Sequence, residues 1–420
     1  MNTLLVIADD FTGALDTGVQ FSKQGVATLV LTAAQLPFNG RGGVDCGGYG
    51  VLVVDTESRH LPPEEARGIV AKIAGEARAH GFRHFYKKTD SALRGNIGAE
   101  LAGLLEAGNG YCLTFVPAFP KSGRVTKNGI QYIDGVEVGQ SVFSKDPFAP
   151  VTRSSVADIV RLQADMRIEN IAAGSYEKAA FQPGEKTLRV LDAESTDDIE
   201  ALGAHLKRSG GLELLAGCAG FAEILPELLD LPKRETKWEK KAENVLIISG
   251  SVNPITAAQI AHGERIGFSS FTLSPEQKLT PSYPGSAECG AFVREVAKEL
   301  ERNRRVIVGT VKDAPLSGAA ERGIPECGAS RQVADNIGEI TLQILNCASV
   351  GSLAVFGGDT LHSVLSKMRC NGVVPLAEIS PGVVAAQALS DWNDCVVVTK
   401  SGGLGDRDVL RRIEEFVLQK

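Results

Sequence analysis

The apolar positions of this chain fall into short continuous runs that alternate with longer amphipathic stretches. Thr3–Ala8, Val26–Leu31 and Gly50–Val54 are mainly apolar, as is typical of strands buried on both faces of a parallel sheet. Between these runs, Gly13–Gln24 and Pro62–His80 repeat apolar residues at helical spacing, and a glycine follows each of them. The pattern predicts successive strand–helix–strand units.

The alternation continues along the first half of the chain. It predicts strands at His84–Lys88 and Tyr111–Val116, with a helix at Ile97–Ala107 between them. A less regular region follows at Pro117–Pro150, in which Asp134-Gly135 is typical of a β-hairpin turn. Helix and strand patterns then resume up to about residue 229.

A charge-dense segment, LPKRETKWEKKAE, interrupts the pattern at Leu231–Glu243. It begins beside a proline and offers few apolar side chains for burial, which is typical of a linker. A chain of 420 residues is also long enough for two cores. We therefore predict a domain at 1–230, a linker and candidate hinge at 231–243, and a second domain at 244–420.

The strand–helix alternation restarts after the linker. The expected strands are Val245–Ile248, Ser270–Leu273, Arg305–Thr310, Leu353–Phe356 and Cys395–Val398, and the expected helices begin at Pro254 or span Ala291–Leu300, Asp335–Asn346 and Asp406–Gln419. Both halves should be three-layer α/β/α domains with mainly parallel sheets. Ligands of such domains bind beyond the carboxyl ends of the strands, so we expect an active site in the cleft between the domains.

Composition narrows the function classes. Hydrophobic residues make up 43% and charged residues 23%, which are ordinary globular values. The net charge of −7 provides no basic surface for nucleic acid, and no apolar run reaches the length of about 20 residues needed to span a membrane. The beginning of the chain lacks the basic region of a signal peptide, so we expect a cytoplasmic protein. The eight cysteines include no C-x-x-C pair, which argues against a zinc or disulfide framework, and a homo-oligomer is left open.

Three loops that follow strands of the first half carry charged and hydroxyl side chains. They are Asp9–Gly13, Asp55–Arg59 and Lys87–Asn96. The cations among them, which could clamp a carboxylate, are Arg59, Lys87, Lys88 and Arg94. Asp10 and Asp90 could accept hydrogen bonds from hydroxyl groups. Simple helix capping by Asp10, Thr12 or Asn96 is the alternative.

Two glycine pairs follow predicted strands of the second half. The first turn is Gly357, Gly358, Asp359 and Thr360, and the second is Lys400, Ser401, Gly402 and Gly403. Such turns allow close approach of the backbone to phosphate, although neither matches a P-loop or G-x-G-x-x-G. Asp359 is the candidate for orienting Mg²⁺, with an N-cap as the alternative. The cations and aspartates of the first half would together suit a small polyhydroxy acid. With a nucleotide bound in the second half, this combination indicates a kinase of an acid sugar.

The chain resembles the four-carbon acid sugar kinase family over nearly its whole length. The motifs that carry the resemblance are ADDFTGALDTGVQ, DTESR, YKKTDSALRGNIGAE, SGSVNPIT, FGGDT, Glu378-x-x-Pro381-Gly382 and VVTKSGGLG. The resemblance implies ATP-dependent phosphorylation of the terminal hydroxyl of a four-carbon sugar acid. The first motifs look most similar to the D-threonate branch, and D-erythronate and 3-oxo-tetronate kinases share most of them.

The resemblance also implies site residues. The family's substrate-binding positions correspond to Asp10, Arg59, Lys87, Lys88, Thr89 and Asp90, and its ATP-binding positions to Ser249 or Ser251, Gly357–Thr360 and Gly402. Asp10 and Asp90 are the candidates for the base that accepts the hydroxyl proton. Two other function classes fit the sequence less well. A nucleotide-dependent oxidoreductase or lyase is disfavoured because Asp9-Asp10 would repel a pyrophosphate, and a non-catalytic sugar-acid sensor would leave both glycine turns without a role.

Overall fold

The computed structural model divides the chain into two compact units, residues 1–236 and 237–420. The structure describes residues 4–36, 47–108, 112–146, 149–178, 186–234, 242–251, 253–310, 326–390, 396–400 and 403–418. Most of the predicted linker, residues 235–241, therefore lies outside the described residues, as do Ser401 and Gly402.

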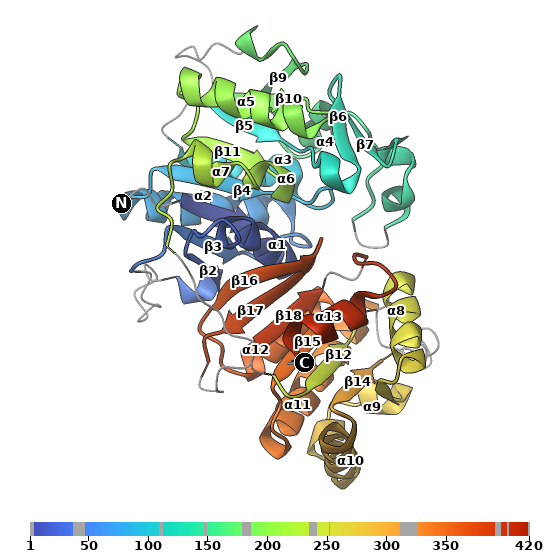
Figure 1. Ribbon diagram of the computed structural model, residues 1–420. Coiled ribbons are helices and arrows are strands. Elements are labelled where there is room, and N and C mark those ends of the chain that lie inside the picture. Colours follow the sequence, from blue (N-terminus) through green and yellow to red (C-terminus); the bar gives the residue numbers. More distant parts are fainter. Residues whose placement is uncertain are drawn as a thin grey trace. The chain divides into compact units, whose positions relative to one another are not determined.

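Unit 1 is built on a parallel sheet with the strand order β2-β3-β1-β4-β11-β5-β10-β9 (Figure 1). Its strands are β1 (Leu4–Ala8), β2 (Thr28–Thr32), β3 (Val51–Asp55), β4 (His84–Lys88), β5 (Cys112–Val116), β9 (Arg167–Ile171), β10 (Thr187–Leu191) and β11 (Leu214–Gly217). Its helices are α1 (Phe11–Ser22), α2 (Pro63–Ala79), α3 (Ile97–Ala107), α4 (Val156–Arg161), α5 (Thr196–Ser209), α6 (Ala219–Ala222) and α7 (Leu225–Leu228). All five residues of β1 are buried, as its apolar sequence predicts.

A small antiparallel sheet occupies the less regular region of unit 1. It contains β6 (Arg124–Lys127), β7 (Ile130–Ile133) and β8 (Val136–Glu137). The predicted hairpin is confirmed, because Ile133 pairs with Val136 around the turn. Asp134 and Gly135 have φ values of 51° and 81°, the left-handed pair that such a two-residue turn requires.

Unit 2 is built on a sheet with the order β13-β14-β12-β15-β18-β17-β16. Its strands are β12 (Val245–Ser249), β13 (Ser269–Thr272), β14 (Arg305–Gly309), β15 (Ser352–Phe356), β16 (Val373–Ser380), β17 (Val383–Ala388) and β18 (Val396–Lys400). Its helices are α8 (Pro254–Arg265), α9 (Pro275–Leu279), α10 (Ala287–Asn303), α11 (Glu326–Cys347), α12 (Gly358–Lys367) and α13 (Val409–Val417). Helices cover the sheet as layers, and none of the described helices is long and apolar enough to cross a membrane.

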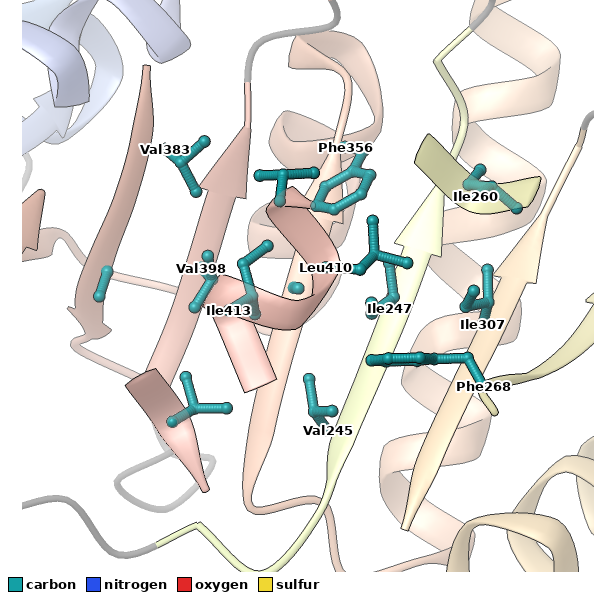
Figure 2. Packing of buried hydrophobic residues seen from close by; sticks show 14 of the residues in the cluster. Val245, Ile247, Ile260, Phe268, Ile307, Phe356, Val383, Val398, Leu410 and Ile413 are labelled. Atoms are coloured by element: carbon teal, nitrogen blue, oxygen red, sulfur yellow. The ribbon is translucent and has the colours of Figure 1, made fainter. Parts of the chain in front are cut away.

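One core of unit 2 lies between the sheet and the helices α8 and α13 (Figure 2). Val245 and Ile247, two residues apart on β12, both contribute to it, as alternate residues of a strand must. Leu410 and Ile413 face the strands from α13, at the spacing of one helical turn. The apolar residues of the last helix therefore serve packing.

The α/β class with mainly parallel sheets is confirmed, and two local predictions need correction. The strand predicted at Cys395–Val398 continues to Lys400, so Lys400 belongs to β18 and not to the turn after it. No strand was predicted at 373–388, where β17 runs antiparallel to both β16 and β18 and the chain reverses between β16 and β17 at the turn containing Gly382, whose φ is 73°. The last helix begins only at Val409, three residues later than predicted, because Gly405 has a φ of 85° and the chain turns before it.

Candidate active site

Three neighbouring strands of unit 1 end at the same edge of the sheet. Ala8 at the end of β1 pairs with Asp55 at the end of β3 and with Lys88 at the end of β4. The three loops singled out by sequence therefore start side by side. The structure brings together Asp10, Arg59, Asp90 and Arg94 in a single cluster.

Arg59 lies among three aspartates. Its Nε donates to Asp9 Oδ2 at 2.7 Å and its Nη2 to Asp10 Oδ1 at 2.7 Å, while Asp90 Oδ1 is 3.9 Å from Nη2. Burial opposes the charged form, but Asp10 and Asp9 outweigh it and hold the pKa of Arg59 well above its usual range. Asp9, which sequence reasoning did not select, is therefore part of the cluster.

Asp90 is held by the residues that follow it in the same loop. Its Oδ2 accepts hydrogen bonds from the backbone N–H groups of Ala92 and Arg94 at 3.1 and 3.2 Å and from Arg94 Nε at 3.0 Å, and its Oδ1 accepts from Arg94 Nη2 at 2.9 Å. Burial would raise the pKa of Asp90, but the charges of Arg94 and Arg59 keep it far below its usual range. The carboxylate stays ionised and its oxygens are well occupied.

Asp10 is more open. It is the N-cap of α1, where its Oδ1 accepts from Gly13 N at 3.1 Å and its Oδ2 from Thr12 Oγ1 at 2.6 Å. A quarter of its side chain, 25%, is exposed. Helix capping is thus confirmed for Asp10, but it is wrong for Thr12, which donates to Asp10. Asn96 is the N-cap residue of α3 but makes no side-chain capping hydrogen bond, and its amide donates to the carbonyls of Ser58 and Leu61 instead.

The structure separates the two neighbouring lysines. Lys87 is fully buried, and its Nζ contacts Ile7 O at 3.1 Å, Lys88 O at 2.7 Å and Glu100 Oε2 at 3.1 Å. Two of these contacts are hydrogen bonds to carbonyls, and the third is an ion pair with Glu100. The Lys88 ammonium instead lies over Gly13, and it donates no hydrogen bond to any residue that the structure describes. Thr89 is buried as well, and its Oγ1 has no partner within the described chain.

A second set of strand ends meets in unit 2. Ser249 of β12 pairs with Phe356 of β15, which pairs with Lys400 of β18. The loop after β12 lies so close to α12 that a Cβ on Gly250 would overlap Thr360 Oγ1. Ser249 Oγ is buried without a partner among the described residues. The predicted nucleotide residues Ser249, Ser251, Gly357, Gly358 and Thr360 therefore lie at the same edge of the sheet.

The turn after β15 opens directly into a helix. Gly357 is the N-cap of α12 with a φ of 111°, a backbone conformation that favours glycine. Asp359 lies exposed in the first turn, so the alternative interpretation of Asp359 as an N-cap is wrong. An exposed carboxylate offers the oxygen ligand that Mg²⁺ prefers, so Asp359 fits this ion.

The Lys400 side chain points into unit 2. Its Nζ donates to Thr256 Oγ1 and Leu404 O, both at 3.1 Å, and lies 5.1 Å from the centroid of the Phe356 ring. Burial lowers the pKa of Lys400 to about 8. Sequence reasoning missed Thr256, which also accepts a hydrogen bond from Ser251 Oγ at 3.2 Å, although the quoted motif SGSVNPIT ends on it.

A glutamine of α8 fixes the chain beyond β18. Gln259 Nε2 donates to the carbonyls of Gly405 and Asp406 at 2.8 and 2.9 Å and is buried. A glutamine inside an amphipathic helix carries no sequence signal for such a role, so it was not selected. Of the turn that it supports, Gly403 is described, whereas the predicted residues Ser401 and Gly402 are not.

Two family models match the two halves of the chain separately. A family model described as a sugar-binding N-terminal domain matches residues 4–225, and one described as a nucleotide-binding C-terminal domain matches residues 246–410. Two solved structures share the fold over 99% of this chain and 100% of their own, each at 22% identity. They are a protein from Salmonella typhimurium LT2 with a TM-score of 0.83 and one from Haemophilus influenzae with a TM-score of 0.74.

The curated relatives are sugar-acid kinases. A D-threonate kinase from Salmonella typhimurium is 28% identical and covers 98% of this chain and 99% of its own. A D-erythronate kinase from Heliobacterium modesticaldum is 29% identical over 100% of this chain and 98% of its own, and a 3-oxo-tetronate kinase from Cupriavidus necator is 27% identical over 96% and 94%. These findings favour a kinase over the oxidoreductase and sensor alternatives. The chain belongs to the four-carbon acid sugar kinase family.

Proposed function

We propose that this protein is an ATP-dependent kinase of the terminal, C4, hydroxyl of a four-carbon sugar acid, and that D-threonate is converted to 4-phospho-D-threonate. The observation that carries the proposal is the mixed cluster of aspartates and cations at one sheet edge of unit 1. Cations pair with a carboxylate and aspartates accept from hydroxyl groups, so a small polyhydroxy acid satisfies both. D-erythronate and 3-oxo-tetronate are the alternative substrates, since relatives are named for all three acids.

Lys88 is our candidate for binding the substrate carboxylate. Its ammonium group is next to Asp10 and Gly13 and is not bonded to a described residue, whereas the donors of Lys87 are occupied. Arg59 and Arg94 add positive charge while they hold the aspartates in place. Asp10, Thr89 and Asp90 then face the hydroxyl groups of the substrate.

We assign the role of proton acceptor to Asp10 in preference to Asp90. The Asp10 side chain is 25% exposed and accepts three hydrogen bonds, whereas the Asp90 side chain is 10% exposed and accepts four. The C4 oxygen forms a bond to the γ-phosphorus as the bond from that phosphorus to the β–γ bridging oxygen breaks. The hydroxyl proton passes to Asp10, and ADP leaves.

ATP is assigned to unit 2. The backbone at Gly357, Gly358 and Gly403 and the hydroxyls of Ser249, Ser251 and Thr360 would surround its phosphates, together with the predicted residues Ser401 and Gly402. Lys400 would supply a positive charge. Asp359 would hold Mg²⁺, which would neutralise the negative charge that develops on the transferred phosphoryl group.

An ADP-release assay with D-threonate, D-erythronate and 3-oxo-tetronate tests the proposal. We expect turnover of D-threonate with the highest kcat/KM; preference for another of the three acids would change the substrate only. Lys88→Met should raise the KM for the acid roughly 30- to 150-fold, because a charge-assisted contact of about 2–3 kcal/mol is lost. Lys72→Met, which removes a 70% exposed lysine of α2, is the matched control. No ADP release with any of the acids would overturn the kinase assignment.

A further inference from the structure

A buried carboxylate lies beneath the acid-sugar site and takes no part in the reaction proposed above. Glu100 is in the first turn of α3 and only 1% of its surface is exposed. The amino-terminal end of a helix favours a negative charge at this place. A carboxylate is nevertheless costly to bury unless its partners are fixed, so those partners indicate what Glu100 does.

On one side, Glu100 holds Lys87. The two side chains form an ion pair of 3.1 Å in which neither side chain exceeds 1% exposure. Lys87 Nζ also donates to the carbonyl of Ile7 on β1 and to that of Lys88 on β4. Through the Lys87 ammonium group, Glu100 is therefore linked to the ends of β1 and β4, from which two of the three site loops follow.

On the other side, Glu100 holds the third loop. Ser58 Oγ donates to Glu100 Oε1, and Ser58 Oγ lies 2.6 Å from Thr56 Oγ1. The backbone N–H of Thr56 in turn donates to the carbonyl of Ala8 at 2.9 Å. The loop that carries Arg59 is thereby tied to the end of β1, from which Asp9 and Asp10 follow.

We propose that Glu100 is a positioning residue of the acid-sugar site, and that it acts through Lys87 and Ser58 by fixing the loops after β1, β3 and β4 relative to one another. Lys87 then belongs to the wall of the site and makes no contact with the substrate, unlike Lys88. The inference rests on the proposed function, because the site it serves is the acid-sugar site.

Three variants test it: Glu100→Gln, Ser58→Ala, and the double variant Lys87→Met with Glu100→Met. Glu100→Gln and Ser58→Ala should raise the KM for the sugar acid by roughly tenfold or more and change the KM for ATP by less than about twofold. Removal of one partner leaves a buried charge, so Glu100→Gln should also lower Tm, while the double variant should regain Tm and keep the raised KM. Leu104→Ala, a fully buried change on the same helix, controls for lost stability and should leave the KM for the acid unchanged.

The outcomes separate the alternatives. A double variant with normal Tm and normal KM for the acid would limit the ion pair to stability, and a normal KM in Ser58→Ala would remove the link to the third loop. If Lys87 bound the substrate itself, Glu100→Gln would free its charge and lower the KM for the acid, which would overturn the inference. The wild-type protein is assayed beside the variants: absence of its turnover defeats the proposed function, whereas normal variants beside an active wild type defeat only this inference.

Discussion

Gly13→Ala should damage the acid-sugar site although it favours the helix that carries it. Gly13 is the third residue of α1, and its backbone N–H donates a hydrogen bond to Asp10 Oδ1. Replacement of glycine by alanine inside a helix is worth about 1 kcal/mol in helix propensity. The added Cβ, however, would overlap Asp10 Oδ1 and would lie 2.9 Å from Lys88 Nζ. The Asp10 carboxylate and the Lys88 ammonium group would therefore both have to move.

The magnitude follows from the bonds that Asp10 would lose. A hydrogen bond to a charged group contributes about 1.5–3 kcal/mol, so displacement of the Asp10 carboxylate more than offsets the gain in propensity. We expect Tm to fall slightly. We expect kcat/KM for the acid to fall roughly 30- to 150-fold, the equivalent of about 2–3 kcal/mol, with the KM for ATP unchanged.

Two glycines of α2 provide matched controls. A Cβ on Gly68 or Gly75 would meet no other atom within 4 Å. Gly68→Ala and Gly75→Ala should therefore gain the propensity term alone, with a higher Tm and unchanged kinetics in thermal-shift and steady-state assays. If Gly13→Ala behaved like these controls, with a raised Tm and wild-type kcat/KM, the contact between Gly13 and the site would be refuted.

Three further predictions concern unit 2. Gly250→Ala should weaken ATP binding measured by calorimetry, because the added Cβ would overlap Thr360 Oγ1, and should leave the affinity for the sugar acid unchanged. An unchanged affinity for ATP would contradict this prediction. The pKa of Lys400 is about 8 in the folded protein against 10.5 for an unperturbed lysine, so the unfolded chain binds more protons between these values and stability should rise with pH there. Urea unfolding of Lys400→Met should lack that rise, and a parallel pH profile would refute it. Asp359→Asn should raise the Mg²⁺ concentration needed for half-maximal activity, and full activity at unaltered Mg²⁺ demand would argue against ligation.

Much of the fold follows from short-range patterns that the sequence displays. The apolar run of β1 and the helix at Ile97–Ala107 lie where they were predicted, because a run buried on both faces and a helical period are properties of neighbouring residues. The antiparallel course of β17 was not predictable in this way. It depends on which strands pair, and an apolar run carries no sign of its direction.

The roles of Lys87 and Lys88 show the limit for the site. Successive residues of a strand point to opposite faces of the sheet, so the two side chains must diverge. Glu100 belongs to α3 and Gly13 to α1, and the face of the sheet that each helix covers cannot be read from the apolar pattern. The sequence therefore did not reveal which lysine meets Glu100 and which lies over Gly13. It placed the charged loops side by side but could not distinguish the lysine paired with Glu100 from the one whose ammonium group has no hydrogen-bond partner in the described chain.

The division of the chain into two compact units has a consequence for cooperativity. Unfolding of such a chain need not be all-or-none, and we expect two calorimetric transitions. A ligand stabilises only the folded part that binds it, so the sugar acid should shift one transition and the nucleotide the other. A single transition that both ligands shift equally would mean that the two halves melt as one. Calorimetry can thus assign each ligand to its half of the chain before any residue is changed.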